Sequence, residues 1–199
     1  YPQQVDDPLG YNYVKIEYDN YIEIGGVRLE SGHSIDRNGN VIVGNGGSGY
    51  AYYLNGTLTL NGFNVSNLKT RGIYAHKPLT LQLTNDNSIS LISNDHAVYV
   101  DGYLIVCGTG SLTVSTTETE QASKDAVVVT TGFHMQSGDL RIESANVGLS
   151  SKNNFGNQFV IDGGKLTIHS KNIGMAVPEC EVIMGTSTAG IAHAAITAH

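Results

Sequence analysis

An internal repeat of about 25 residues is the feature that most constrains the fold of this chain. A small residue followed by an apolar one recurs at spacings of 25, 29, 22 and 26 residues. A sustained period of this length is typical of repeat proteins, in which one structural unit stacks on the next. The pairs are Gly72-Ile73, Ala97-Val98, Ala126-Val127, Gly148-Leu149 and Gly174-Met175.

Two further columns of alternating apolar residues precede each small residue. Alternation with a period of two is typical of a half-buried β-strand. The nearer column begins 9, 8, 14, 8 and 8 residues before the small residue, so its register is nearly constant. Its pairs are Phe63/Val65, Ile89/Leu91, Leu112/Val114, Leu140/Ile142 and Leu166/Ile168. The farther column is Leu58/Leu60, Leu81/Leu83, Ile105/Cys107, Phe133/Met135 and Phe159/Ile161.

Three short strands in each repeat predict an all-β solenoid. The expected fold is a single-stranded right-handed parallel β-helix with about 25 residues and three short strands per coil. A leucine-rich repeat is the nearest alternative, but its L-x-x-L-x-L-x-x-N signature is missing. We expect one domain with a cap at residues 1–48, coils at 49–185 and a tail or second cap at 186–199. The departures from register predict surface loops within 116–125 and 150–158.

The first 53 residues hold eight of the 11 tyrosines. Residues 41–43 and 50–53 resemble a first, imperfect coil. A cap is the favoured interpretation of this region, because an open solenoid end exposes unpaired strand edges. An aromatic ligand platform is the alternative.

Composition narrows the range of functions. The formal net charge is -7 with 11 Lys and Arg, which argues against nucleic acid as a partner, because phosphate binding needs clustered cations. No apolar run approaches the roughly 20 residues of a membrane span, so membrane insertion is not expected. There are 24 glycines and no tryptophan. The missing tryptophan weakens the case for sugar stacking, although tyrosine can substitute.

The cysteines and histidines of the chain do not form a known catalytic or metal-binding motif. Cys107 falls in the farther apolar column and is expected in the core, and no disulfide with Cys180 is expected. The seven histidines show no zinc-binding spacing. Solenoid pectinases carry an ordered set of four motifs, of which the chain has two fragments, Gly32-His33 and Arg141-Ile142. A non-catalytic function is therefore favoured.

A cation site is a second possibility. Calcium prefers several oxygen ligands from Asp, Asn and backbone carbonyls, and turns between strands supply them. The candidate ligands are Asp95, Asp101, Asp125 and Asn146. The favoured alternative is turn chemistry, since Asp and Asn side chains bond nearby backbone at corners.

The coils resemble those of a group of secreted bacterial right-handed β-helix proteins. The segments that carry the likeness are 58–65 (LTLNGFNV), 104–114 (LIVCGTGSLTV) and 159–168 (FVIDGGKLTI), and it extends roughly from 56 to 176. That group is calcium-associated, carbohydrate-binding and adhesin-like. Its acidic residue before the small column is kept here at Asp125 alone. The resemblance implies an extracellular or cell-surface protein, whose signal peptide would lie outside this sequence.

The expected function is a non-catalytic extracellular polysaccharide-binding or adhesin-like module. Its partner would be a polysaccharide, of the plant cell-wall type or another glycan, with calcium as a possible cofactor. An acidic protein would need a bridging cation to meet an anionic polymer. The alternatives are a polysaccharide-degrading glycosidase or lyase and a purely structural segment of a surface protein. The candidate glycan-binding residues are Tyr50, Tyr52, Tyr53, Tyr74 and Tyr99.

Overall fold

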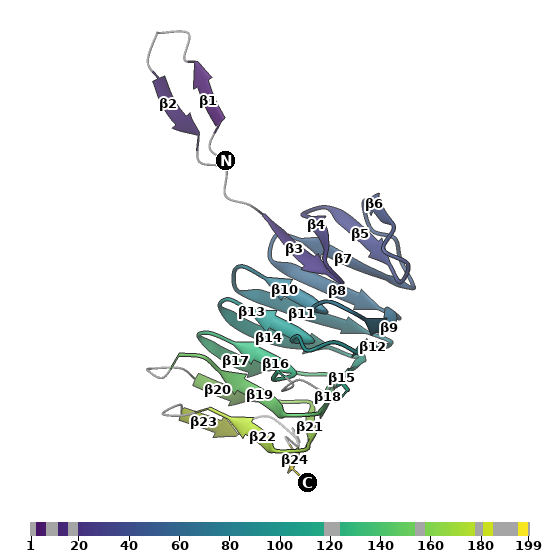
Figure 1. Ribbon diagram of the computed structural model, residues 1–199, viewed down its shortest axis with the longest axis vertical. Coiled ribbons are helices and arrows are strands. Elements are labelled where there is room, and N and C mark those ends of the chain that lie inside the picture. Colours follow the sequence, from purple (N-terminus) through teal and green to yellow (C-terminus); the bar gives the residue numbers. More distant parts are fainter. Residues whose placement is uncertain are drawn as a thin grey trace.

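The protein is a parallel β-solenoid, as the repeat predicted, with roughly 26 residues per turn. A computed structural model describes residues 3–6, 12–15, 20–117, 124–153, 158–177, 181–184 and 195–198. Within these ranges the chain forms strands and turns and no helix, and the strands stack along the long axis of the molecule (Figure 1). None of these residues forms a helix with the length and hydropathy that crossing a bilayer requires.

Three sheets form the walls of the solenoid. The nine-stranded sheet has the order β23 (Glu181–Met184), β20 (Gln158–Ile161), β17 (Gly132–Met135), β14 (Tyr103–Gly108), β11 (Leu79–Thr84), β8 (Thr57–Asn61), β7 (Tyr50–Leu54), β5 (His33–Asp36) and β6 (Val41–Val43). The six-stranded sheet has the order β24 (Ala195–Ala198), β21 (Lys165–Ser170), β18 (Asp139–Ser144), β15 (Ser111–Thr116), β12 (Asp86–Leu91) and β9 (Asn64–Leu68). The seven-stranded sheet has the order β22 (Ile173–Ala176), β19 (Val147–Ser151), β16 (Val127–Val129), β13 (Val98–Val100), β10 (Ile73–Ala75), β3 (Tyr21–Ile24) and β4 (Val27–Glu30).

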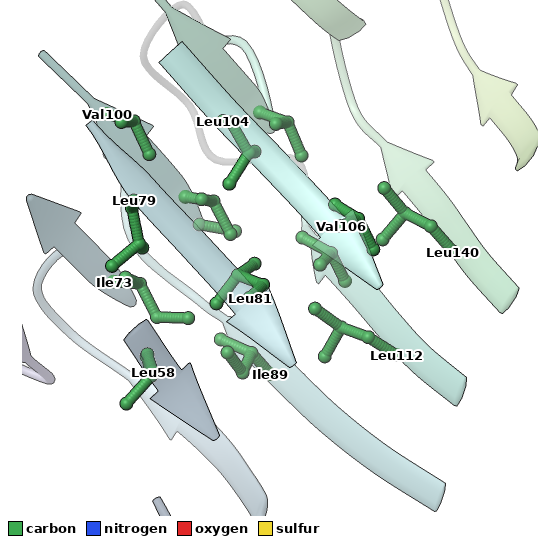
Figure 2. Packing of buried hydrophobic residues seen from close by; sticks show 14 of the residues in the cluster. Leu58, Ile73, Leu79, Leu81, Ile89, Val100, Leu104, Val106, Leu112 and Leu140 are labelled. Carbon is green, nitrogen blue, oxygen red and sulfur yellow. The ribbon is translucent and has the colours of Figure 1, made fainter. Parts of the chain in front are cut away.

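Like residues stack in the core, as the columns predicted. In the seven-stranded sheet the apolar member of each small-apolar pair is the direct partner of the next, in the order Ile73, Val98, Val127, Leu149 and Met175. The side chains from all three sheets meet in one continuous cluster of buried residues (Figure 2). Phe133 and Phe159 stack on adjacent rungs with ring centroids 6.1 Å apart. The interior is therefore a set of apolar ladders along the solenoid axis.

The predicted register slips by one residue in β14. Leu104 and Val106 face the interior, where they pair with Phe133 and Met135, while Ile105 and Cys107 face outward. The prediction that Cys107 is a core residue is therefore wrong. Residues 104–107 are all apolar, so alternation alone cannot show which of them point inward. Burial at the partly covered outer face still raises the pKa of the Cys107 thiol. Cys180 lies outside the described residues.

The register of β12 was also predicted wrongly. Ile89, which was expected opposite Leu112, pairs instead with Val114 and Val65. The partner of Leu112 is Asn87, which is 3% exposed. A buried polar side chain thus takes one place in a ladder of leucines, where a search for apolar alternation does not find it.

The N-terminal strands are antiparallel and extend two of the sheets. β3 pairs with β10 and with β4, and β7 pairs with β8 and with β5. Residues 50–53 therefore form one arm of a hairpin rather than the predicted imperfect coil. These added strands lie over the end of the solenoid (Figure 1), and their residues Ile22, Leu29 and Ile35 are buried in its core. β1 (Gln3–Asp6) and β2 (Asn12–Lys15) form a separate antiparallel pair.

Most of the predicted loop and tail residues lie outside the described part of the chain. For the loop within 116–125 this holds for residues 118–123, and for the loop within 150–158 it holds for residues 154–157. The predicted tail is described at residues 195–198, which form β24.

Candidate functional site

Two of the predicted tyrosines stack on the outer face of the seven-stranded sheet. Tyr74 is the central residue of β10, and its direct partner in β13 is Tyr99. Their neighbours along each strand are buried, so both rings point outward. The ring centroids are 5.0 Å apart and the rings are inclined by 12°. The repeat produces this stack, because equivalent positions on adjacent coils of a solenoid lie about 4.8 Å apart.

Two histidines extend the stack, and one of them connects it to a third tyrosine. The ring of His76 lies 4.5 Å from that of Tyr74 and 5.2 Å from that of Tyr21 in β3. The ring of His96 lies 5.5 Å from that of Tyr99. We call these five residues (Tyr21, His76, Tyr74, Tyr99 and His96) the tyrosine cluster. On the next rung Val128 is fully buried, so the open part of this face ends at Tyr99.

The charged group of an arginine or lysine lies near the ring of each tyrosine in the cluster. The guanidinium carbon of Arg28 lies 3.8 Å from the ring centroid of Tyr21, and that of Arg71 lies 4.0 Å from the centroid of Tyr74. The ammonium of Lys152 lies 5.9 Å from the centroid of Tyr99. Cations at these distances are attracted by the negative face of the ring. The repeat does not predict these cations, because Arg28 belongs to a strand that precedes the coils and Lys152 lies far along the chain from Tyr99.

The environment of the cluster changes the pKa of two of its members. Burial lowers the pKa of His96 below its ordinary value of 6.5, and repulsion from Lys152 and Lys124 acts in the same direction. The neutral ring places Nδ1 2.7 Å from the carbonyl oxygen of Asp125, to which the N–H donates. Burial raises the pKa of Tyr99, and the nearby Asp101 carboxylate adds to the effect. Both side chains are therefore uncharged at neutral pH.

The predicted calcium ligands lie near this face and bond to protein groups. Asp95 lies 3.4 Å from the ammonium of Lys124 and 3.9 Å from the Arg71 guanidinium. Asp101 accepts a hydrogen bond from Thr130. Asp125 and Asn146 do come together, since the Asn146 amide donates to the carboxylate at 3.2 Å. In the described part of the chain no three His, Cys, Asp or Glu side chains gather as a metal site would need. Calcium stays a prediction.

The corner that precedes the seven-stranded sheet shows how these residues serve the fold. Lys124 bonds to Asp95 on the preceding coil, and Asn172 donates to Asn146 on its preceding coil at 2.9 Å. Side chains at one corner therefore pair from coil to coil, which agrees with a structural role for these polar residues at the corners.

The other predicted tyrosines belong to β7. Tyr53 is 4% exposed within the core, and its hydroxyl donates to Asn20. Its place among the glycan-binding candidates is therefore withdrawn, because its ring faces inward. Tyr50 lies against the backbone of Gly46, and Tyr52 is partly exposed. Both lie on the nine-stranded sheet, so they do not extend the tyrosine cluster.

A hollow at the corner between the nine-stranded and six-stranded sheets brings two carboxylates together. It has a volume of about 420 Å³, and Asp86 and Asp139 line it on either side of Ser111. The Ser111 hydroxyl donates to Asp86 at 2.7 Å. The sequence gives no sign of this pair, because the two residues are 53 positions apart in the chain.

Comparison with known protein families, curated proteins and solved structures finds no match to this chain. The resemblance to secreted carbohydrate-binding β-helix proteins therefore stays a prediction.

Proposed function

We propose that the protein is a non-catalytic, extracellular or cell-surface module that binds a polysaccharide on the tyrosine cluster. One observation carries the proposal: Tyr74 and Tyr99 stack in register on the open face of a solenoid wall. Aromatic side chains with a polar tip suit carbohydrate, which combines apolar ring faces with many hydroxyl groups. A row of such side chains along the solenoid axis suits an extended polymer better than a small compact ligand.

The test measures how tightly a double variant and a control variant bind to an array of polysaccharides. Replacing Tyr74 and Tyr99 together by alanine should weaken binding at least about tenfold, because two adjacent contacts are lost. Tyr52→Ala is the matched control, since Tyr52 is a partly exposed tyrosine of the nine-stranded sheet. Equal weakening by both variants would contradict the proposed face. Binding of no polymer would contradict the function and favour a purely structural segment of a surface protein.

A polysaccharide-degrading enzyme is a second candidate, favoured by the carboxylates of Asp86 and Asp139 in one hollow. Glycoside hydrolysis uses a pair of carboxyl groups on either side of the scissile bond. Release of reducing ends from a polysaccharide, abolished by either Asp86→Asn or Asp139→Asn, would support this function. Asp36→Asn, at the last residue of β5, is the control. Unchanged release by both variants would reject it.

A further inference from the structure

The stacked rings of Tyr74 and Tyr99 form the one contact between two tyrosine rings in the part of the chain that the structure describes. Their centroids are 5.0 Å apart and the rings are inclined by 12°. The two residues are direct partners on neighbouring strands, β10 and β13. Because backbone hydrogen bonds hold adjacent strands about 4.8 Å apart, the two phenols stay next to each other in the folded protein.

Both phenols are within reach of a small reagent in the solvent. Each is partly exposed at the centre of a strand whose other two residues are buried. Tyr53, by comparison, is 4% exposed. A phenol gives up a single electron more readily than most side chains, and the chain holds no tryptophan that would compete for an oxidant. A radical formed on either ring of the stack therefore has a second phenol in direct contact with it.

We propose that Tyr74 and Tyr99 are a modification site at which a one-electron oxidant couples the two rings into dityrosine. Each phenol loses one electron to the oxidant and its hydroxyl proton to the solvent, which leaves two phenoxyl radicals. These combine by forming a carbon–carbon bond between the Cε atoms next to the two hydroxyl positions. The hydrogen on each joined carbon then moves to the neighbouring oxygen and restores both aromatic rings. The product has two hydrogen atoms fewer than the starting protein.

The new bond joins two coils of the solenoid covalently. It closes a loop from residue 74 to residue 99, between strands that already pair in register. A cross-link of this kind restricts the unfolded chain, as a disulfide does. The site uses two residues of the tyrosine cluster, but the coupling needs only an oxidant and does not depend on polysaccharide binding.

The experiment oxidises the full chain with photo-excited tris(bipyridyl)ruthenium and persulfate, which takes up the electrons. Asp86 and Asp95 lie between the two tyrosines in the chain, so a protease that cleaves before aspartate separates them onto different peptides. Mass spectrometry should find these peptides joined, with the loss of two hydrogen atoms. We expect at least about tenfold more of this product than of any other dityrosine, because the fold holds these two rings together.

Two single variants and a control test the assignment. Tyr74→Phe and Tyr99→Phe should each abolish the joined peptides and most of the dityrosine fluorescence. Tyr52→Phe, which removes a partly exposed tyrosine of the nine-stranded sheet, should leave both unchanged. A yield in Tyr74→Phe or Tyr99→Phe equal to that of the wild type would overturn the site. Covalent dimers of the protein as the main product would overturn it as well.

The melting temperature tests the consequence for stability. The cross-linked protein should melt at least about 5 °C above the protein before oxidation. An unchanged melting temperature of the linked protein would overturn the restraint on the coils. Before oxidation, each phenylalanine variant should melt within about 2 °C of the wild type, which checks that it is folded.

Discussion

Asn87 interrupts the apolar pattern of the repeat in the sequence, yet in the structure it occupies the equivalent buried position of its coil. Its amide oxygen accepts the backbone N–H of Phe63 at 2.8 Å, and its nitrogen donates to the carbonyls of Thr84, Asn85 and Ser111. Asn87 thereby joins three successive coils at the corner where β11 turns into β12. A leucine in this place has the shape of the ladder and none of these bonds.

Asn87→Leu should therefore destabilise the protein, although the apolar pattern favours leucine. We expect a loss of about 2–4 kcal/mol in the free energy of unfolding, since several buried polar groups lose their partner. Urea denaturation measures it. Asn64→Ala is the control, because Asn64 is an exposed asparagine whose loss should cost less than about 1 kcal/mol. A variant as stable as the wild type would show that the ladder requires shape alone.

His96 is the residue at which stability should depend on pH. Its folded-state pKa is depressed by burial, so it stays neutral in the folded protein below pH 6.5 while the unfolded chain takes up a proton. Proton uptake by the unfolded state lowers the stability as the pH falls from about 6.5 to the lower folded-state pKa.

Urea denaturation between about pH 7 and pH 5 tests this dependence, because a histidine of the unfolded chain, with an ordinary pKa of about 6.5, takes up its proton in that range. The loss on acidification should be smaller in His96→Gln than in the wild type. His76→Gln, an exposed histidine of the same cluster, should follow the wild type. The expectation fails if the wild type and His96→Gln lose stability in parallel.

At the scale of the strand, the sequence predicted that strands exist and roughly where, but not always which face is buried. The small-apolar column was right throughout, since its apolar members pair with one another from coil to coil in the seven-stranded sheet. The slip in β14 arose because Leu104 to Cys107 are uniformly apolar. Period-two patterning carries no information about orientation in such a run.

The small column has a steric cause, which gives a prediction for Gly148, the second residue of β19. A Cβ at Gly148 would lie 2.2 Å from Cγ2 of Ile168 and 2.6 Å from the carbonyl oxygen of Gly174. Gly148→Ala should therefore cost about 1–3 kcal/mol through overpacking. Thermal unfolding followed by circular dichroism measures the loss. Ala126→Gly, in the same column, should cost about 0.5–1 kcal/mol. A larger loss in Ala126→Gly than in Gly148→Ala would contradict the steric explanation.

At the scale of the molecule, the sequence predicted half of the candidate site. Tyr74 and Tyr99 were identified because the repeat itself places them on successive coils. Arg28, on β4, and Lys152, just after β19, were not, because they lie outside that repeat position and cation–π contacts leave no periodic signal. Tyr53 was misplaced because it alternates with Tyr52 in a hairpin, where one of the two must face inward.

The last strands of a solenoid have unpaired edges unless other strands cover them. In this protein the antiparallel strands β3 and β7 pair with the edges of β10 and β8. Leu29 in β4 is fully buried among them. A carboxylate there has no partner, so Leu29→Asp should detach these strands at a cost of roughly 3 kcal/mol or more. The uncovered edges should then pair between molecules. Size-exclusion chromatography with light scattering should show concentration-dependent association. Val43→Asp, at an 82% exposed position of β6, should leave the molecular mass unchanged. Identical elution of both variants would mean that the core coils stand without these strands.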